Sequence, residues 1–198
     1  MNRSLLNAFL LIALAVWFAA CNAPAPTVMT ANNNGAATRN GPVIPQPTSS
    51  VPGELIFKTP DGWKTEQPTS SMRVAQYKLP SDDGDASLVV YFFGQGQGGS
   101  VQDNFERWVG QMQQTMDKAK TENLTVNGMP VTLLDVSGTF SGDMMTGSQS
   151  PQPNSRMRAG VIETPKGNYF IKLVGPEKTV TSWNDAFLAF VKSAEFKK

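Results

Sequence analysis

The chain carries few of the side chains on which enzyme chemistry most often depends. It has no histidine and one cysteine, Cys21, among 198 residues. These counts exclude a disulfide within the chain, a zinc site of cysteine and histidine, and a nucleophile activated by histidine. Chemistry by carboxylates, lysine, tyrosine or serine stays open, as does a role in binding.

The most distinctive pattern is a glycine-rich run at 94–99, Gly-Gln-Gly-Gln-Gly-Gly. It contains G-x-G-x-x-G between an expected strand and an expected helix, where glycines let the backbone approach a pyrophosphate. No series of βαβ units follows, which disfavours a dinucleotide site. A tight turn and a binding loop remain as interpretations. The candidate binding loop comprises Gly94, Gln95, Gly96, Gln97, Gly98, Gly99 and Ser100, with Arg107 adding a charge.

Two further groups resemble metal sites only superficially. Asp82, Asp83 and Asp85 lack the spacing and the distal glutamate of a calcium loop, so a solvated turn is favoured. The methionines Met144, Met145 and Met157 carry thioethers that suit copper(I), but loop or core packing is the favoured interpretation. No metal or other cofactor is predicted.

Acidic and aromatic side chains near the expected helices have simpler interpretations than catalysis. Asp103 and Glu106 lie three residues apart, and we expect a capping residue and a solvated side chain rather than an acid/base pair. The tryptophans Trp63, Trp108 and Trp183 are expected in the core. We therefore predict that the protein is not an enzyme.

The charge balance disfavours two classes of partner. Lys and Arg total 17 against 16 Asp and Glu, and hydrophobic residues make up 40% of the chain. A balanced chain without a dense basic stripe does not suit phosphate-dominated binding of nucleic acid or electrostatic docking on anionic lipids. The hydrophobic content is sufficient for a folded core.

The amino-terminal segment has the parts of an export signal. Arg3 precedes a run at 5–20 that is apolar apart from Asn7 and ends in small residues. Residues 18–21, Phe-Ala-Ala-Cys, resemble a bacterial lipobox, which implies cleavage before Cys21 and attachment of lipid to its thiol. An uncleaved membrane anchor and an ordinary secreted protein are the alternatives. Asn22 leaves an outer-membrane location open.

Residues 21–53 are expected to form a disordered tether carrying the lipid. The segment contains six prolines, repeated asparagine, alanine and threonine, and one charge, Arg39. It has little apolar surface to offset the entropy of ordering. A flexible coil of this length reaches about 30 Å. Docking of Val43, Ile44 or Val51 on the folded domain is the alternative.

The remainder, 54–198, alternates between strand and helix patterns. Asn127-Gly128 is the favoured two-residue hairpin turn. One helix is expected to begin at Ser100, burying Val101, Phe105, Trp108, Val109, Met112 and Met116, and another at Ser182, burying Trp183, Phe187, Leu188 and Val191. Strands are expected at 54–58, 72–79, 88–93, 123–126, 131–140, 156–163 and 169–174, with a loop at 141–155.

This element order predicts an α+β fold, a mostly antiparallel sheet of about six to seven strands with two packed helices. Residues 57–63, Phe-Lys-Thr-Pro-Asp-Gly-Trp, resemble the opening of PsbP-like and DcrB-like domains. That resemblance implies a sandwich of sheet and helices, found in many small lipoproteins and lumenal accessory proteins. It assigns no functional residue.

The sequence therefore predicts a membrane-anchored lipoprotein whose exported domain binds a protein or cell-envelope component on the extracytoplasmic face of a membrane. The anchor is the lipid on Cys21, and nucleic acid is not an expected partner. Two alternatives stay open. One is an exported enzyme that uses carboxylates, and the other is a carrier of a small apolar ligand, marked by an apolar cavity between sheet and helices.

Overall fold

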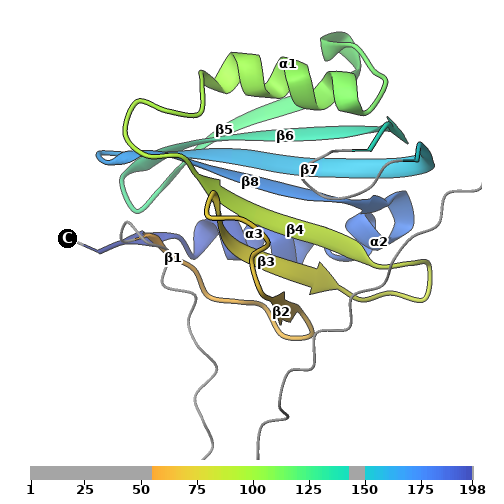
Figure 1. Cartoon of the computed structure of the whole chain (residues 1–198), viewed down its shortest axis with the longest axis horizontal. Helices are drawn as coiled ribbons and strands as arrows, with labels where there is room; N and C mark the ends of the chain where they lie inside the picture. The colour runs from red at the N-terminus through yellow and green to blue at the C-terminus, as the bar shows by residue number, and fades with distance from the viewer. Residues whose placement is uncertain (1–54, 143–149, 198) are drawn as a thin grey trace, which may run out of the picture. The chain divides into compact units, whose positions relative to one another are not determined.

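The alternating apolar pattern produces an antiparallel sheet of seven strands (Figure 1). The computed structural model describes residues 55–142 and 150–197, which all belong to the unit Pro45–Lys198. The predicted α+β class is confirmed. From edge to edge the strands are β2 (Lys64–Glu66), β3 (Arg73–Leu79), β4 (Ala86–Phe92), β8 (Gly167–Pro176), β7 (Gln152–Thr164), β6 (Met129–Phe140) and β5 (Lys120–Val126).

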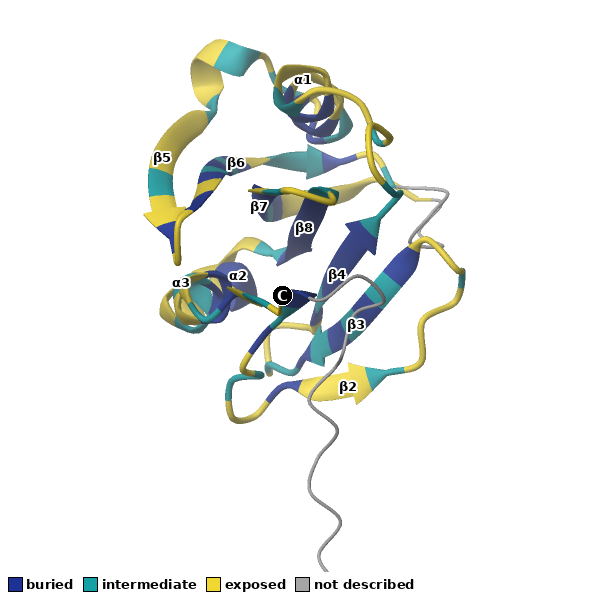
Figure 2. Ribbon diagram, turned by 90° about the vertical axis from the view of Figure 1, so that its left-hand side faces the viewer, coloured by how far each residue is buried: buried dark blue, intermediate teal, exposed yellow. Residues whose placement is uncertain are grey.

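Helices cover both faces of this sheet (Figures 1 and 2). On one face lies α1 (Val101–Gln111), and on the other lie α2 (Glu177–Ser182) and α3 (Asn184–Lys192). Successive side chains of a strand point to opposite faces, so the sheet separates two cores. Phe105 and Trp108 belong to the core beneath α1, whereas Phe187 and Phe190 belong to the core beneath α2 and α3.

The central strand β4 contributes to both cores, as its continuous apolar run predicts. Leu88 and Val90 belong to the core beneath α3, and Val89 and Tyr91 belong to the core beneath α1. The strand pairs with β3 on one side and β8 on the other. It therefore has no exposed edge to water.

The predicted hairpin at Asn127 and Gly128 is confirmed. Both residues have positive φ, +49° and +82°, and Val126 pairs with Met129 across the turn. The primed turns that join twisted antiparallel strands need this backbone, which asparagine and glycine adopt at least cost. The Asn127 side-chain amide also donates a 2.8 Å hydrogen bond to the carbonyl of Ala194.

The carboxyl-terminal helix differs from the sequence prediction. We expected one helix beginning at Ser182, but α2 ends at that residue and α3 begins two residues later. The prediction that Ser182 caps a helix is wrong, because its hydroxyl donates to the carbonyl of Thr179. Trp183 joins the two helices, and its indole Nε1 donates a 3.1 Å hydrogen bond to the carbonyl of Pro80.

Several expected boundaries also shift. Strand β7 begins at Gln152, inside the expected loop at 141–155, where it pairs with Phe140. Helix α1 ends before Met116, which instead opens a 3₁₀ turn, Met116–Lys118. The strand expected at 54–58 is present as the shorter β1 (Leu55–Ile56), which pairs with β9 (Glu195–Phe196). Strands β2 and β9 were not expected, because they are too short for periodicity to reveal.

A group of partly buried charges joins β6 and β7 to α2. Asp135 accepts two hydrogen bonds from Arg156, at 2.8 and 2.7 Å, and a third from Arg158 at 3.0 Å. Arg156 also donates to the hydroxyl of Thr181, and the Arg158 guanidinium lies 5.4 Å from the ring centroid of Phe187. Because one carboxylate serves two arginines, the group holds a fixed geometry under α2.

Candidate functional site

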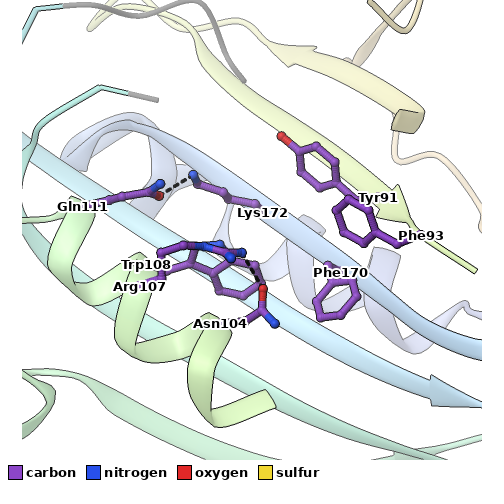
Figure 3. Close-up of a pocket in the computed structure, with 8 residues that line it drawn as sticks. All are labelled: Tyr91, Phe93, Asn104, Arg107, Trp108, Gln111, Phe170 and Lys172. Atoms are coloured by element: carbon purple, nitrogen blue, oxygen red, sulfur yellow. Dashed lines mark hydrogen bonds between the residues drawn. The ribbon is translucent and has the colours of Figure 1, made fainter. Parts of the chain in front are cut away.

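A small pocket lies between α1 and the sheet (Figure 3). Its cavity measures about 30 Å³. Four lining residues come from α1, and four come from β4, the residue after it, and β8. They are Tyr91, Phe93, Asn104, Arg107, Trp108, Gln111, Phe170 and Lys172.

Aromatic rings form the walls of this pocket. Tyr91 and Phe93 stack with ring centroids 6.1 Å apart, and Phe170 lies edge-on to Phe93 at 5.6 Å and to Trp108 at 6.4 Å. Such offset and edge-to-face contacts are the arrangements that aromatic rings prefer. The walls are therefore rigid and of low polarity.

Polar groups enter the pocket from the helix and from β8. Asn104 is 1% exposed, and its side-chain oxygen accepts a hydrogen bond from the Arg107 guanidinium at 2.5 Å. Lys172 is 3% exposed and donates to the side-chain oxygen of Gln111 at 2.7 Å. Its ammonium also lies 5.4 Å from the ring centroid of Phe140.

Asn104 connects the pocket to the candidate binding loop. Its side-chain nitrogen donates to the carbonyls of Gly98 and Ser100, both at 2.8 Å. Both hydrogens of the Asn104 side-chain amide are therefore donated in hydrogen bonds, as the burial of an amide group requires. The loop, Asn104 and Arg107 therefore form one hydrogen-bonded unit.

Backbone conformation and close packing both favour glycine in the loop. Gly94, Gly96, Gly98 and Gly99 all have positive φ. A Cβ on Gly98 would lie 2.5 Å from the Phe170 ring, and a Cβ on Gly167 would lie 2.8 Å from the carbonyl oxygen of Gly94. The loop therefore packs closely against the sheet and the β7–β8 turn. Gln95 and Gln97 are exposed.

The surroundings of the loop differ from those of a dinucleotide site. Strand β4, which precedes the loop, is antiparallel to both of its neighbours. A nucleotide-binding glycine loop instead begins a parallel βαβ unit. Ser100 caps α1 as predicted, accepting a 3.1 Å hydrogen bond from the Asp103 amide.

All three aspartates of the expected solvated turn are exposed, and Asp83 and Asp85 form ion pairs. Asp85 lies 2.6 Å from Lys78, and Asp83 lies 3.2 Å from Lys178. The hydrogen bond from Lys78 lowers the pKa of the Asp85 carboxyl. Residues 55–142 and 150–197 contain no group of three or more histidine, cysteine, aspartate or glutamate side chains able to hold a metal ion.

The remaining candidates take structural positions. Asp103 accepts a hydrogen bond from Ser100, and Glu106 accepts one from Gln102, so the two carboxylates have separate partners. Met157 is fully buried in the core beneath α1. Met144 and Met145 lie outside the described residues.

The expected positions of the tryptophans hold for two of the three. Trp63 and Trp108 are buried, whereas Trp183 is partly buried against the core beneath α3. Trp63 packs with Tyr77 and Phe190.

Three wider grooves lie away from the glycine-rich loop. One of about 230 Å³ includes the Lys78–Asp85 ion pair, one of about 460 Å³ lies between the hairpin turn at Asn127 and β9, and one of about 370 Å³ is lined by residues that include Gln114 and Glu177. None of them is lined by a residue of the candidate binding loop or by Arg107. The pocket under α1 is lined by Arg107 and by buried polar side chains, and Asn104 connects it to the candidate binding loop, whose own residues do not line it.

The sequence interpretation missed most of the pocket. It singled out the loop and Arg107, but not Asn104 or the aromatic wall. Lys172 carried a readable signal, since a lysine inside the apolar run 169–174 must be buried with a polar partner. The signal for Asn104 was weaker. It lies four residues before Trp108, which was expected in the core, and residues four apart share one face of a helix.

Cys21 and the expected signal and tether lie outside the described residues. Within 55–142 and 150–197, every helix is too short or too polar to cross a membrane.

No family model matches the sequence, and a search of curated proteins gives no match. The solution structure of cyanobacterial PsbP (CyanoP) from Synechocystis sp. PCC 6803 is similar, with 14% identity and a TM-score of 0.46 over 73% of this chain and 88% of that chain. LpqN of Mycobacterium tuberculosis, described as involved in cell envelope biogenesis, shows 12% identity and a TM-score of 0.47 over 74% and 86%. These values describe a partial likeness of fold and assign no function.

Proposed function

We propose that the protein is a lipoprotein, anchored through lipid on Cys21, whose exported domain binds a protein or cell-envelope component. The binding surface consists of the candidate binding loop, 94–100, together with Arg107 and the pocket beneath α1. The role is non-catalytic, and the domain lies on the extracytoplasmic face of a membrane. Nucleic acid is not a partner.

One observation carries the binding proposal. Buried Asn104 holds the loop through two carbonyls and holds the exposed Arg107 through its oxygen. A binding site gains affinity when its polar groups are already in position, because less freedom is lost on association. The hydrogen bonds of Asn104 supply that preorganisation.

The two alternatives find less support at this site. An enzyme using carboxylates needs two of them in one pocket, and the eight residues that line this pocket include none. A carrier of an apolar ligand needs a cavity of about 300 Å³ or more. The cavity between α1 and the sheet is about 30 Å³.

The anchor is tested by intact-mass analysis of the protein purified from bacterial membranes. We expect loss of residues 1–20 and added mass from acyl chains on Cys21. The Cys21→Ser variant should leave the membrane fraction or keep its signal, while its exported domain stays folded. Met1 retained on the wild-type protein, or an unmodified thiol at position 21, would refute the anchor.

The binding surface is tested by photocrosslinking in intact membranes. A benzophenone amino acid at Gln97 lies in the exposed part of the loop, and a matched one at Lys192 lies on α3, on the opposite face of the sheet. We expect one discrete product from position 97 that weakens when Arg107 is changed to Gln. Identical products from both positions, or none from position 97, would contradict the proposal.

A further inference from the structure

The dimensions of the pocket limit what it can hold. One water needs about 10–15 Å³ of such space. A cavity of about 30 Å³ therefore accepts a group of two or three heavy atoms. A carboxylate has this size, whereas an aromatic ring or a tetrahedral phosphate is larger.

Two cationic side chains line the pocket, Arg107 and Lys172, and the Lys172 ammonium donates to the side-chain oxygen of Gln111. The guanidinium of Arg107 donates to Asn104 and forms no ion pair with any residue of 55–142 or 150–197. A guanidinium has five donors in a planar fork, which matches the two oxygens of a carboxylate. One donor is engaged by Asn104, and this contact leaves the others available.

The walls strengthen such a contact. Tyr91, Trp108 and Phe170 are buried, so the site has low polarity. A charged hydrogen bond is stronger in such surroundings than in water. Phe93 is half-buried and continues the wall toward solvent, where it offers an apolar surface to the remainder of a ligand.

We propose that this pocket binds the carboxylate group of a ligand that carries an apolar substituent. Arg107 contacts the carboxylate, and Asn104 is a positioning residue that holds the guanidinium against the glycine-rich loop. This inference rests on the proposed function and specifies the chemistry of the same site. The carboxylate belongs either to a free organic acid or to a larger envelope component that displays one.

The test uses the mature lipoprotein in detergent micelles and phenylacetate as the probe. Ligand-observed NMR titration compares phenylacetate with phenylacetamide, its neutral counterpart, and with inorganic phosphate. We expect phenylacetate to bind at least about tenfold more tightly than phenylacetamide, because a charged hydrogen bond contributes about 1.5–3 kcal/mol. Equal binding of the amide, or tighter binding of phosphate, would overturn the assignment.

Variants then locate the binding. Arg107→Gln should weaken phenylacetate binding about tenfold and leave phenylacetamide unaffected, and Arg107→Lys should give an intermediate loss because it removes the fork. Asn104→Asp tests whether Asn104 positions the Arg107 guanidinium. We expect this variant to change the affinity for phenylacetate more than the affinity for phenylacetamide. Lys192→Gln, on the far side of the sheet, is the matched control. Loss of phenylacetate binding in that control, or none in Arg107→Gln, would refute the site.

Competition experiments distinguish a free organic acid from an envelope component as the source of the carboxylate. They also distinguish failure of the carboxylate assignment from failure of the proposed function. If phenylacetate suppresses the product formed from position 97 in membranes, the carboxylate belongs to the crosslinked envelope component. If phenylacetate binds without suppressing it, the ligand is a free acid. If the product depends on Arg107 but no carboxylate binds, the carboxylate assignment fails while the proposed function stands.

Discussion

Gly98 lies where the glycine-rich loop comes closest to the sheet. Its φ is +90°, and an added Cβ would lie 2.5 Å from the Phe170 ring. Phe170 is fully buried between the pocket and the core beneath α1, so its ring has little room to move. At Gly96, where φ is +70°, nothing lies within 4 Å of an added Cβ.

The two glycines therefore form a matched pair for mutation. We expect Gly98→Ala to lower the free energy of unfolding by about 2–4 kcal/mol, from the positive φ and the clash together. Gly96→Ala should lower it by about 1 kcal/mol, from φ alone. Urea unfolding followed by tryptophan fluorescence measures both. Equal losses would show that the contact with Phe170 is not a constraint.

Asp135 is a partly buried carboxylate that pairs with two arginines. Burial by itself raises the pKa of its carboxyl, but the hydrogen bond from Arg156 and the charges of Arg158 and Arg156 outweigh burial. The net pKa lies below the ordinary value. Because the folded pKa is lowered, the stabilisation is present above the unfolded pKa and is lost as pH falls through the folded pKa.

Asp135→Asn should therefore lower the free energy of unfolding at neutral pH by about 2–4 kcal/mol, since it leaves two arginines without their carboxylate. The difference from wild type should begin to shrink as the pH falls below about 4, where Asp135 of the unfolded chain takes up a proton, and should be lost once the pH falls below the lowered pKa of the folded state. Urea unfolding from pH 7 down to about pH 2.5 checks both effects. Asp117→Asn, at an exposed turn, is the control and should leave the unfolding midpoint nearly unchanged. A pH-independent difference would contradict this account.

At the scale of elements, α1 places the pocket, and its start is fixed by local sequence. Ser100 has an extended backbone, and its hydroxyl accepts from the Asp103 amide. Four of the eight pocket residues follow on this helix. Its buried face includes Phe105 and Trp108, as the 3.6-residue period predicts, but also Asn104.

Loss of the cap should loosen this end of the helix. We expect Ser100→Ala to lower the free energy of unfolding by about 1 kcal/mol and to increase hydrogen exchange of the first-turn amides, which lose an acceptor. Ser100→Thr keeps the hydroxyl and should behave nearly as wild type. Unchanged exchange in the alanine variant would mean that packing on the sheet alone fixes the helix start.

At the scale of the described domain, one sheet separates two cores and couples them. Strands β4, β7 and β8 contribute side chains to both cores, so neither core forms without the shared sheet. The pairing of Leu55 with Phe196 also joins the two ends of the described chain. These connections predict one cooperative unfolding transition for residues 55–142 and 150–197.

Substitutions in either core should therefore lower a single unfolding midpoint. We expect Phe105→Ala, beneath α1, and Phe187→Ala, beneath α2 and α3, each to destabilise the protein by about 3–5 kcal/mol. Far-ultraviolet circular dichroism and tryptophan fluorescence should give coincident urea curves for both variants. Two separate transitions in either variant would show that the cores unfold independently.

Features that depend on neighbours along the chain can be derived from the sequence. The Asn127-Gly128 turn, the cap at Ser100 and the apolar run of β4 each follow from residues a few positions apart, and together they predict the α+β class. The export signal and the attachment of lipid to Cys21 are also inferred from neighbouring residues, and they stay predictions.

Features that join distant segments depend on the tertiary structure. Lys172 is brought to Gln111, far away in the sequence, by the packing of α1 on β8. Trp183, where the carboxyl-terminal helix is broken, donates to the carbonyl of Pro80, more than a hundred residues earlier. Such contacts require the whole sheet to assemble first, so no local period or spacing encodes them.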